Sequence, residues 1–212
     1  MTASSSPPAR LRATNLACRR GTRLLFKGLD LELPAGQIMW LRGQNGRGKT
    51  SLLRIAAGLS SPEDGQVLID GAPPRSVRPL VFIGHANALK EDLSVFEALE
   101  FLLRIHGRPC QPGDVHAALD RLGLSSRRGA MVRTLSQGQR RRVALARLAA
   151  HSDASLWLLD EPFDALDSDG VERVNGLLAE HAGRGGSVLL TSHLSLDRPR
   201  LAPVDLDLDR YC

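Results

Sequence analysis

"LRGQNGRGKTSLL", residues 41–53, is the stretch that decides the fold of this 212-residue chain. It follows a short apolar segment, opens a helix-like one, and fills the phosphate-loop pattern Gly-x-x-x-x-Gly-Lys-Thr from Gly43 to Thr50. Its glycines let the backbone turn so that successive N–H groups point inward at a helix N-terminus, where they bind an anion. Average residue frequencies give such a coincidence in roughly one chain in a hundred. We therefore interpret the stretch as a nucleotide site rather than a Gly-rich turn before a helix.

Two side chains of this loop have predicted roles. Lys49 is predicted to contact the β- and γ-phosphates, and Thr50 to hold Mg²⁺ through its hydroxyl. The loop and the first turn of the helix surround the phosphates, so we predict the whole segment as the binding surface. The candidate nucleotide-binding residues are Gly43, Gln44, Asn45, Gly46, Arg47, Gly48, Lys49, Thr50 and Ser51.

A second motif, SLWLLDEP at residues 155–162, places two acids directly after an apolar run. Such a run is typical of a strand buried on both faces of a parallel sheet. An isolated Asp-Glu pair is more often a solvated loop, but the apolar run and the phosphate loop favour a functional interpretation. We predict that Asp160 anchors Mg²⁺, usually through water, and that Glu161 orients or deprotonates the attacking water.

The rest of the chain alternates strand-like and helix-like segments, with no internal repeat. We predict an α/β P-loop NTPase core, mostly parallel, with an N-terminal antiparallel β portion and a helical insert. Residues 1–9 are predicted to be a disordered tail, and residues 10–212 a single domain with its insert at about 90–150. The predicted strands are 24–33, 37–41, 66–70, 79–83, 155–160 and, as the last clear strand, 185–192.

Composition narrows the class of protein. Hydrophobic residues make up 42% of the chain and charged residues 24%, as in ordinary globular proteins. The net charge is +5, which suits nucleic acid or an anionic membrane, but only 4% aromatic residues disfavour base stacking, so no nucleic-acid partner is expected. No apolar run approaches the ~18 residues of a membrane span, and no secretory signal is recognised. Three unpaired cysteines indicate a reduced, cytoplasmic chain. The sequence contains no Cys-x-x-Cys-His motif, so nothing indicates covalently attached haem.

A third motif, LSQGQRRRVALARL at residues 135–148, opens another predicted helix. Ser136 and Gln139 form a capping box, but that explanation leaves Gly138, a poor residue for the first turn, without a reason. The stretch resembles the ABC-transporter signature Leu-Ser-Gly-Gly-Gln, with Gln137 in place of the first Gly. The other motifs follow the order of that family: the acidic strand end at 156–161, "ALD" at 165–167, and "TSH" ending at His193.

Resemblance to ABC ATPases implies ATP as the nucleotide, with Mg²⁺, and a helical signature subdomain. It implies a head-to-tail dimer of two copies, in which the P-loop of one copy and the signature of the other sandwich each ATP. The isolated monomer is then expected to hydrolyse ATP poorly. Glu161 is the expected general base, His193 the switch that senses the γ-phosphate, and Asp167 the D-loop residue. The signature residues are Leu135, Ser136, Gln137, Gly138 and Gln139.

The stretch FIGHANALKEDLS, residues 82–94, contains His85 at the end of a predicted strand. Without the rest of the sequence, His85 has three interpretations: a metal ligand, a proton carrier or, most often for such a residue, only a polar side chain at a strand end. Ser94 and Glu97 form a capping box. In ABC ATPases the strand before the helical insert ends in a Gln, the Q-loop Gln, and counting back from Ser94 places His85 at that position. Since Mg²⁺ prefers oxygen ligands, we expect His85 to act through water or against the partner protein.

The short chain, the "GH" at 84–85 and the stretch GRGKTSLLRIAAGLSSPEDGQVLIDG at 46–71 resemble the ATP-binding subunits of cytochrome c biogenesis complexes, or haem exporters. This resemblance implies an integral membrane permease subunit as partner and a peripheral location on the cytoplasmic face of the bacterial inner membrane. Arg19 or Arg20 replaces the aromatic residue that often stacks on adenine in this family.

The sequence disfavours two other functions. A soluble ABC ATPase acting on nucleic acid or ribosomes usually has paired cassettes or a long coiled-coil insertion, and the sequence has neither. A binding module with a dead site is disfavoured because Lys49, Asp160, Glu161 and His193 are all intact.

Overall fold

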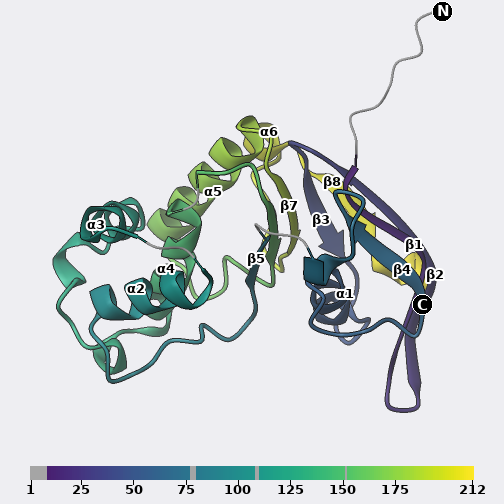
Figure 1. Ribbon diagram of the computed structural model, residues 1–212, viewed down its shortest axis with the longest axis horizontal. Helices are drawn as coiled ribbons and strands as arrows, with labels where there is room; N and C mark the ends of the chain where they lie inside the picture. The colour runs from purple at the N-terminus through teal and green to yellow at the C-terminus, as the bar shows by residue number, and fades with distance from the viewer. Residues whose placement is uncertain (1–8, 77–79, 108–109, 151) are drawn as a thin grey trace, which may run out of the picture. The chain divides into compact units, whose positions relative to one another are not determined.

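The computed structural model describes residues 9–76, 80–107, 110–150 and 152–212 (Figure 1). The chain forms two compact units. The strand unit comprises Met1–Phe82, Asp153–Asp160 and Glu180–Cys212, and the helical unit comprises Ile83–Ser152 and Glu161–Ala179. The tail predicted at 1–9 lies, up to residue 8, outside the described residues. One domain over 10–212, with an insert at about 90–150, stays a prediction.

An antiparallel sheet forms the first part of the strand unit. Its strands β1 (Ala9–Arg20), β2 (Arg23–Pro34) and β4 (Asp64–Ile69) lie in the order β2-β1-β4. Buried and exposed residues alternate along β2 from Leu29 to Leu33, which is the period-two pattern of a half-buried strand. The predicted N-terminal antiparallel portion is therefore confirmed.

A second sheet has the order β5-β6-β7-β3-β8 (Figure 1). Its strands are β5 (Leu80–Ile83), β6 (Leu156–Leu159), β7 (Ser187–Thr191), β3 (Ile38–Arg42) and β8 (Val204–Asp207). The pairs β6·β7, β7·β3 and β3·β8 are parallel. Every residue of β6 and β7 is buried, as the apolar sequences predict.

One expectation was wrong, because 185–192 is not the last strand. The strand β8 follows it and pairs with β3 at the edge of the sheet. Its sequence, VDLD, is short and half acidic, with two exposed and two half-buried residues. An edge strand of this kind has no continuous apolar run, so hydrophobic patterning does not reveal it.

The helix α1 (Lys49–Ala56) connects the phosphate loop to the core of the strand unit. It buries Leu52, Leu53, Ile55 and Ala56 among apolar residues of both sheets. The chain ends in α6 (Arg198–Leu201) and the short 3₁₀ turn η4 (Leu208–Tyr211). A further 3₁₀ turn, η1, covers Pro74–Ser76.

The helical unit packs α2 (Val95–Ile105), α3 (Pro112–Arg121) and α4 (Gln137–Ala149) against one another (Figure 1). The helix α5 (Ser168–Gly183) starts in this unit, and the 3₁₀ turns η2 (Ser125–Arg127) and η3 (Val132–Thr134) precede α4. Both predicted capping boxes are confirmed, at Ser94–Glu97 for α2 and at Ser136–Gln139 for α4. Among the described residues, no helix is long and apolar enough to cross a membrane.

A buried histidine of α5, His181, packs against the strand β6. The His181 ring stacks on Trp157 with the ring centroids 3.6 Å apart and the planes at 8°. Its Nε2 lies 2.9 Å from the Ser155 carbonyl oxygen and therefore carries the proton in this contact. A Cβ atom on Gly186 would lie 2.2 Å from this Nε2, so only glycine fits there. Burial, which disfavours the charged form, lowers the pKa of His181 to about 4.

We expect acid to destabilise the strand unit through His181. Its pKa is lower in the folded protein than in the unfolded chain, so below about pH 6.5 the unfolded chain binds a proton that the folded protein does not. The free energy of unfolding is therefore fully retained above about pH 6.5 and falls as the pH is lowered toward 4. The loss between pH 7.5 and pH 5 is about 2 kcal/mol. Urea unfolding at both pH values measures it. The control His181→Phe keeps a flat ring but cannot titrate, so an identical pH dependence in both proteins would contradict the assignment.

Candidate nucleotide site

The phosphate loop joins the carboxyl end of β3 to the first residue of α1. Gly43, Gly46 and Gly48 have positive φ angles of 137°, 78° and 101°, which only glycine adopts without strain. Gly48 is also crowded, because a Cβ there would lie 3.2 Å from the Phe26 ring. These glycines bend the loop around the N-terminus of α1, where unpaired N–H groups bind anions.

Lys49 is the first residue of α1. Its Nζ donates to the Gly43 carbonyl at 2.6 Å and to the Gln44 carbonyl at 3.3 Å. The ammonium therefore lies over the loop that is predicted to hold the phosphates. Phosphate oxygens are stronger acceptors than these carbonyls, so an incoming nucleotide would replace them.

Asp160 lies at the end of β6 and is buried, with 3% of its surface exposed. One carboxylate oxygen accepts from the Thr50 hydroxyl at 2.9 Å, and the other accepts from the Thr191 hydroxyl at 2.9 Å. The two predicted metal residues are thus in direct contact. Thr191 was missed by the sequence analysis, although it lies in the "TSH" stretch.

The chemistry of Thr50 and Asp160 fits Mg²⁺, because both present hard oxygen donors. Proteins usually bind nucleotide Mg²⁺ with one or two such groups, and the phosphates and water complete its shell. In the part of the chain that the structure describes, no group of three or more His, Cys, Asp or Glu side chains converges as a metal cage.

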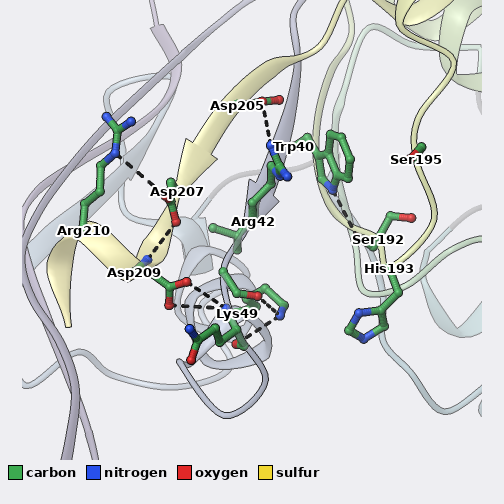
Figure 2. A pocket seen from close by; sticks show the side chains of 13 residues that line it. Trp40, Arg42, Lys49, Ser192, His193, Ser195, Asp205, Asp207, Asp209 and Arg210 are labelled. Atoms are coloured by element: carbon green, nitrogen blue, oxygen red, sulfur yellow. Dashed lines mark hydrogen bonds and ion pairs between the residues drawn. The ribbon is translucent and has the colours of Figure 1, made fainter.

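A cavity of about 590 Å³ lies in the strand unit and contains both Lys49 and His193 in its wall (Figure 2). The P-loop, the turn after β7 and the chain's C-terminal segment form it. Its lining residues are Trp40, Leu41, Arg42, Gly43, Gln44, Lys49, Ser192, His193, Ser195, Asp205, Asp207, Asp209 and Arg210.

The turn that carries His193 is fixed on both sides. The Trp40 indole Nε1 donates to the Ser192 carbonyl at 3.3 Å (Figure 2), and the Ser192 hydroxyl bonds the Leu194 backbone. The preceding Thr191 bonds Asp160. The backbone of His193 is therefore tied to the strand end that carries Asp160, while its imidazole stays exposed.

The C-terminal segment supports the first turn of the phosphate loop. The Gln44 N–H donates to the Asp209 carboxylate at 3.1 Å, and Arg47 forms an ion pair with the same carboxylate at 3.1 Å. No sequence motif marks Asp209. The two adenine candidates, Arg19 and Arg20, are both exposed at the end of β1, and Arg19 forms an ion pair with Glu63 at 2.8 Å.

The signature residues belong to the helical unit. Ser136 accepts from the Gln139 N–H at 3.2 Å, and Gln139 Oε1 accepts from the Ser136 N–H at 3.0 Å. A Cβ at Gly138 would lie 2.4 Å from the Ala165 carbonyl oxygen, which explains a glycine in the first turn of α4. Leu135 is buried, while Ser136 and Gln137 are exposed.

Asp167 has a local structural role in the helical unit. It forms an ion pair with Arg142 at 2.5 Å, and it caps α5 by accepting from the Gly170 N–H at 2.9 Å. Its predicted D-loop role is compatible with both contacts, because 60% of its side chain is exposed.

Glu161 and His85 also lie in the helical unit. Glu161 has a φ of 50°, a left-handed conformation that is costly for any residue but glycine. Its carbonyl accepts from Arg141 at 2.7 Å. Arg141 also donates to Gly84 and Asn87, which lie on either side of the exposed His85.

The glycine-rich turn, Lys49 and the buried Asp160 define a P-loop nucleotide-binding protein. A model of the ABC transporter family matches residues 26–164. The cytochrome c biogenesis ATP-binding export protein CcmA of Pseudomonas syringae pv. syringae (strain B728a) is 45% identical over 207 residues, 95% of this chain and 96% of that protein. The CcmA protein of Nitrosomonas europaea is 40% identical over 92% of this chain and 94% of its own length. The chain belongs to the ABC transporter family.

Solved structures support the same fold. A putative ABC transporter ATP-binding protein from Pyrococcus furiosus has a TM-score of 0.81 and 24% identity, covering 95% of this chain and 98% of its own. A dimeric ATP-binding cassette bound to ADP and Pi has a TM-score of 0.75 and 24% identity, covering 87% and 88%. The predicted ABC ATPase fold and the relationship to cytochrome c biogenesis proteins are confirmed, and ATPase activity is expected. The individual residue roles stay predictions.

Proposed function

We propose that the chain is the ATP-hydrolysing subunit of a membrane ABC complex for c-type cytochrome biogenesis, acting in haem export or delivery. The observation that carries this proposal is the similarity to CcmA proteins over nearly the whole of both chains. The intact P-loop, Asp160, Glu161 and His193 support an active enzyme. The proposed location is peripheral, on the cytoplasmic face of the bacterial inner membrane.

Phosphate binding falls to the strand unit. The N–H groups at the start of α1 and the Lys49 ammonium would bind the β- and γ-phosphates. The Thr50 hydroxyl and the Asp160 carboxylate would hold Mg²⁺. When bound, this ion supplies positive charge that offsets the negative charge of the phosphates. Thr191 would keep Asp160 oriented through the hydrogen bond at 2.9 Å.

Hydrolysis requires a base and a second copy of the chain. The Glu161 carboxylate would take a proton from the attacking water, and His193 would position the γ-phosphate. The N-terminus of α4 in the second copy would add N–H donors and its positive dipole end to the γ-phosphate. The exposure of Ser136 and Gln137 supports this role for the signature.

The membrane partner is proposed to be an integral permease subunit that docks beside His85 and residues 86–105. Closing of the dimer on ATP and opening after hydrolysis would move this surface. The alternative function on nucleic acid or ribosomes is not favoured, since the similar full-length relatives are named as export proteins.

Co-purification tests the proposal. The tagged chain is isolated from detergent-solubilised membranes of the organism that encodes it, and the bound proteins are identified by mass spectrometry. We expect integral membrane proteins of cytochrome c biogenesis. Recovery of ribosomes or nucleic acid in their place would overturn the proposal.

We expect Ser136→Arg to abolish ATP hydrolysis, because the new side chain would clash in the nucleotide site of the other copy. Lys49→Ala is also expected to be inactive, because it removes a phosphate contact in the P-loop of the copy that carries the change. A mixture of the two variants forms one site with an intact P-loop and an intact signature. ATPase activity should therefore return in part on mixing, and a mixture as inactive as its components would contradict the shared site.

We expect His85→Ala to lower partner-stimulated ATP hydrolysis more than ATP affinity, since His85 is exposed and outside the strand unit that holds the P-loop. His85→Gln should keep much of the activity, because it restores the family's residue. The measurement compares ATPase rates of the membrane complex with nucleotide affinity for each variant. Unchanged stimulated turnover in His85→Ala would make His85 only a strand-end residue.

A further inference from the structure

Arg141 is a buried cation two residues after the signature. It lies on α4, and only 3% of its surface is exposed. A buried guanidinium is costly unless its N–H groups are bonded, because it gives up its hydration. No part of the mechanism above uses this side chain, so its partners indicate what it does.

The two ends of the guanidinium bind two different segments of the helical unit. Nη1 donates to the Gly84 carbonyl at 2.9 Å and to the Asn87 side-chain oxygen at 3.1 Å. Nη2 donates to the Glu161 carbonyl at 2.7 Å. Arg141 thus joins the loop that carries His85 to the backbone of the proposed base. All of these residues lie within one compact unit.

The bond to Glu161 falls at a strained position. Glu161 has a φ of 50°, and a non-glycine residue keeps this conformation only where its surroundings fix it. A charged donor at 2.7 Å on its carbonyl is a strong restraint. The orientation of this peptide also sets the direction in which the Glu161 carboxylate leaves the backbone.

The far end of the His85 loop is bound to the signature segment. The Val132 N–H donates to the Leu93 carbonyl at 2.9 Å, and Arg140 forms an ion pair with Glu91 at 3.0 Å. The loop is therefore held at its start by Arg141 and at its end by residues that flank the signature. A displacement of the loop would act on Arg141.

We propose that Arg141 is a positioning residue that couples the His85 loop, residues 84–93, to the carboxylate of Glu161 through its bonds to Gly84 and Asn87. Movement of this loop by a docked partner shifts the guanidinium, and the guanidinium shifts the Glu161 peptide. A lysine cannot replace it, because a single ammonium lacks the two-ended fork that reaches both segments. The inference rests on the proposed role of Glu161 as the base.

The test measures ATP affinity, KM and kcat of the membrane complex with Arg141→Gln, Arg141→Lys and a control, Arg12→Gln. The control removes a surface ion pair with Glu32 in the strand unit, in which the two side chains are 58% and 59% exposed. We expect both Arg141 variants to keep ATP affinity within about twofold and to lose about 10- to 100-fold in kcat through misplacement of the base. Arg12→Gln should match the wild type. A wild-type kcat in Arg141→Lys, or an equal loss of affinity and kcat, would overturn the proposal.

A second variant keeps the proposal testable if Arg141 variants do not fold. Asn87→Ala removes one acceptor of the fork at a half-buried position. Its effect on partner-stimulated turnover should not add to that of His85→Ala, because both changes act on one loop. Additive effects would contradict the coupling. Glu161→Gln is measured in parallel: if it hydrolyses ATP normally, the proposed base fails, whereas inactive Glu161→Gln with normal Arg141 variants defeats only the coupling.

Discussion

Replacing Glu161 by Gln is expected to lower ATP hydrolysis by about 100- to 10,000-fold, the usual contribution of a general base. The change is nearly isosteric and leaves the Glu161 carbonyl bonded to Arg141, so the backbone conformation should persist. Lys49, Thr50 and Asp160 keep their contacts. The variant should therefore bind ATP and remain closed as an ATP-bound dimer.

Size-exclusion chromatography with ATP and Mg²⁺ measures this dimer, beside a steady-state ATPase assay. Asp164→Asn is a matched control, because it removes an exposed acid three residues further along the same turn. It should hydrolyse ATP as the wild type does. A Glu161→Gln protein that stays monomeric and still hydrolyses ATP would refute both the base and the sandwich dimer.

Replacing Lys49 by Ala is expected to weaken ATP binding by about 100-fold or more, because the phosphates lose a hydrogen-bonded charge partner. Lys49→Arg should not restore binding. The loop holds the ammonium between two carbonyls of its own backbone, at 2.6 and 3.3 Å, and a planar fork does not fit a niche shaped for a point charge.

Nucleotide affinity is measured directly, by titration calorimetry or a fluorescent ATP analogue. Lys90→Ala serves as the control, since it removes one of the other two lysines, whose ammonium lies 4.5 Å from the Phe101 ring centroid in the helical unit. It should bind ATP normally. Wild-type affinity and turnover in Lys49→Ala would show that the loop is not the nucleotide site.

The sequence predicted those features that short segments determine. Glycines at 43 and 48 are required by local backbone angles, and the caps at Ser94 and Ser136 satisfy N–H groups three residues away. The buried strand before Asp160 is a continuous apolar run. For such features the physical cause lies within a few residues, so the pattern shows it.

Contacts between distant segments could not be predicted in this way. Asp209 lies 165 residues from Gln44, Trp40 lies 152 from Ser192, and Arg141 lies 57 from Gly84. In each case a side chain bonds a backbone group of another segment, an N–H for Asp209 and a carbonyl oxygen for Trp40 and Arg141, and almost any residue supplies such a group. The pattern therefore carries no signal for them, and they appear only when the fold brings the segments together.

ATP hydrolysis by this chain is proposed to drive c-type cytochrome biogenesis in the membrane complex. The most direct measurement is the level of c-type cytochromes, by haem staining of membrane proteins, in the organism that encodes the chain after its gene is replaced by one for Glu161→Gln. We expect c-type cytochromes to be lost while b-type cytochromes remain. Normal levels of c-type cytochromes in cells that contain only the Glu161→Gln protein would contradict it.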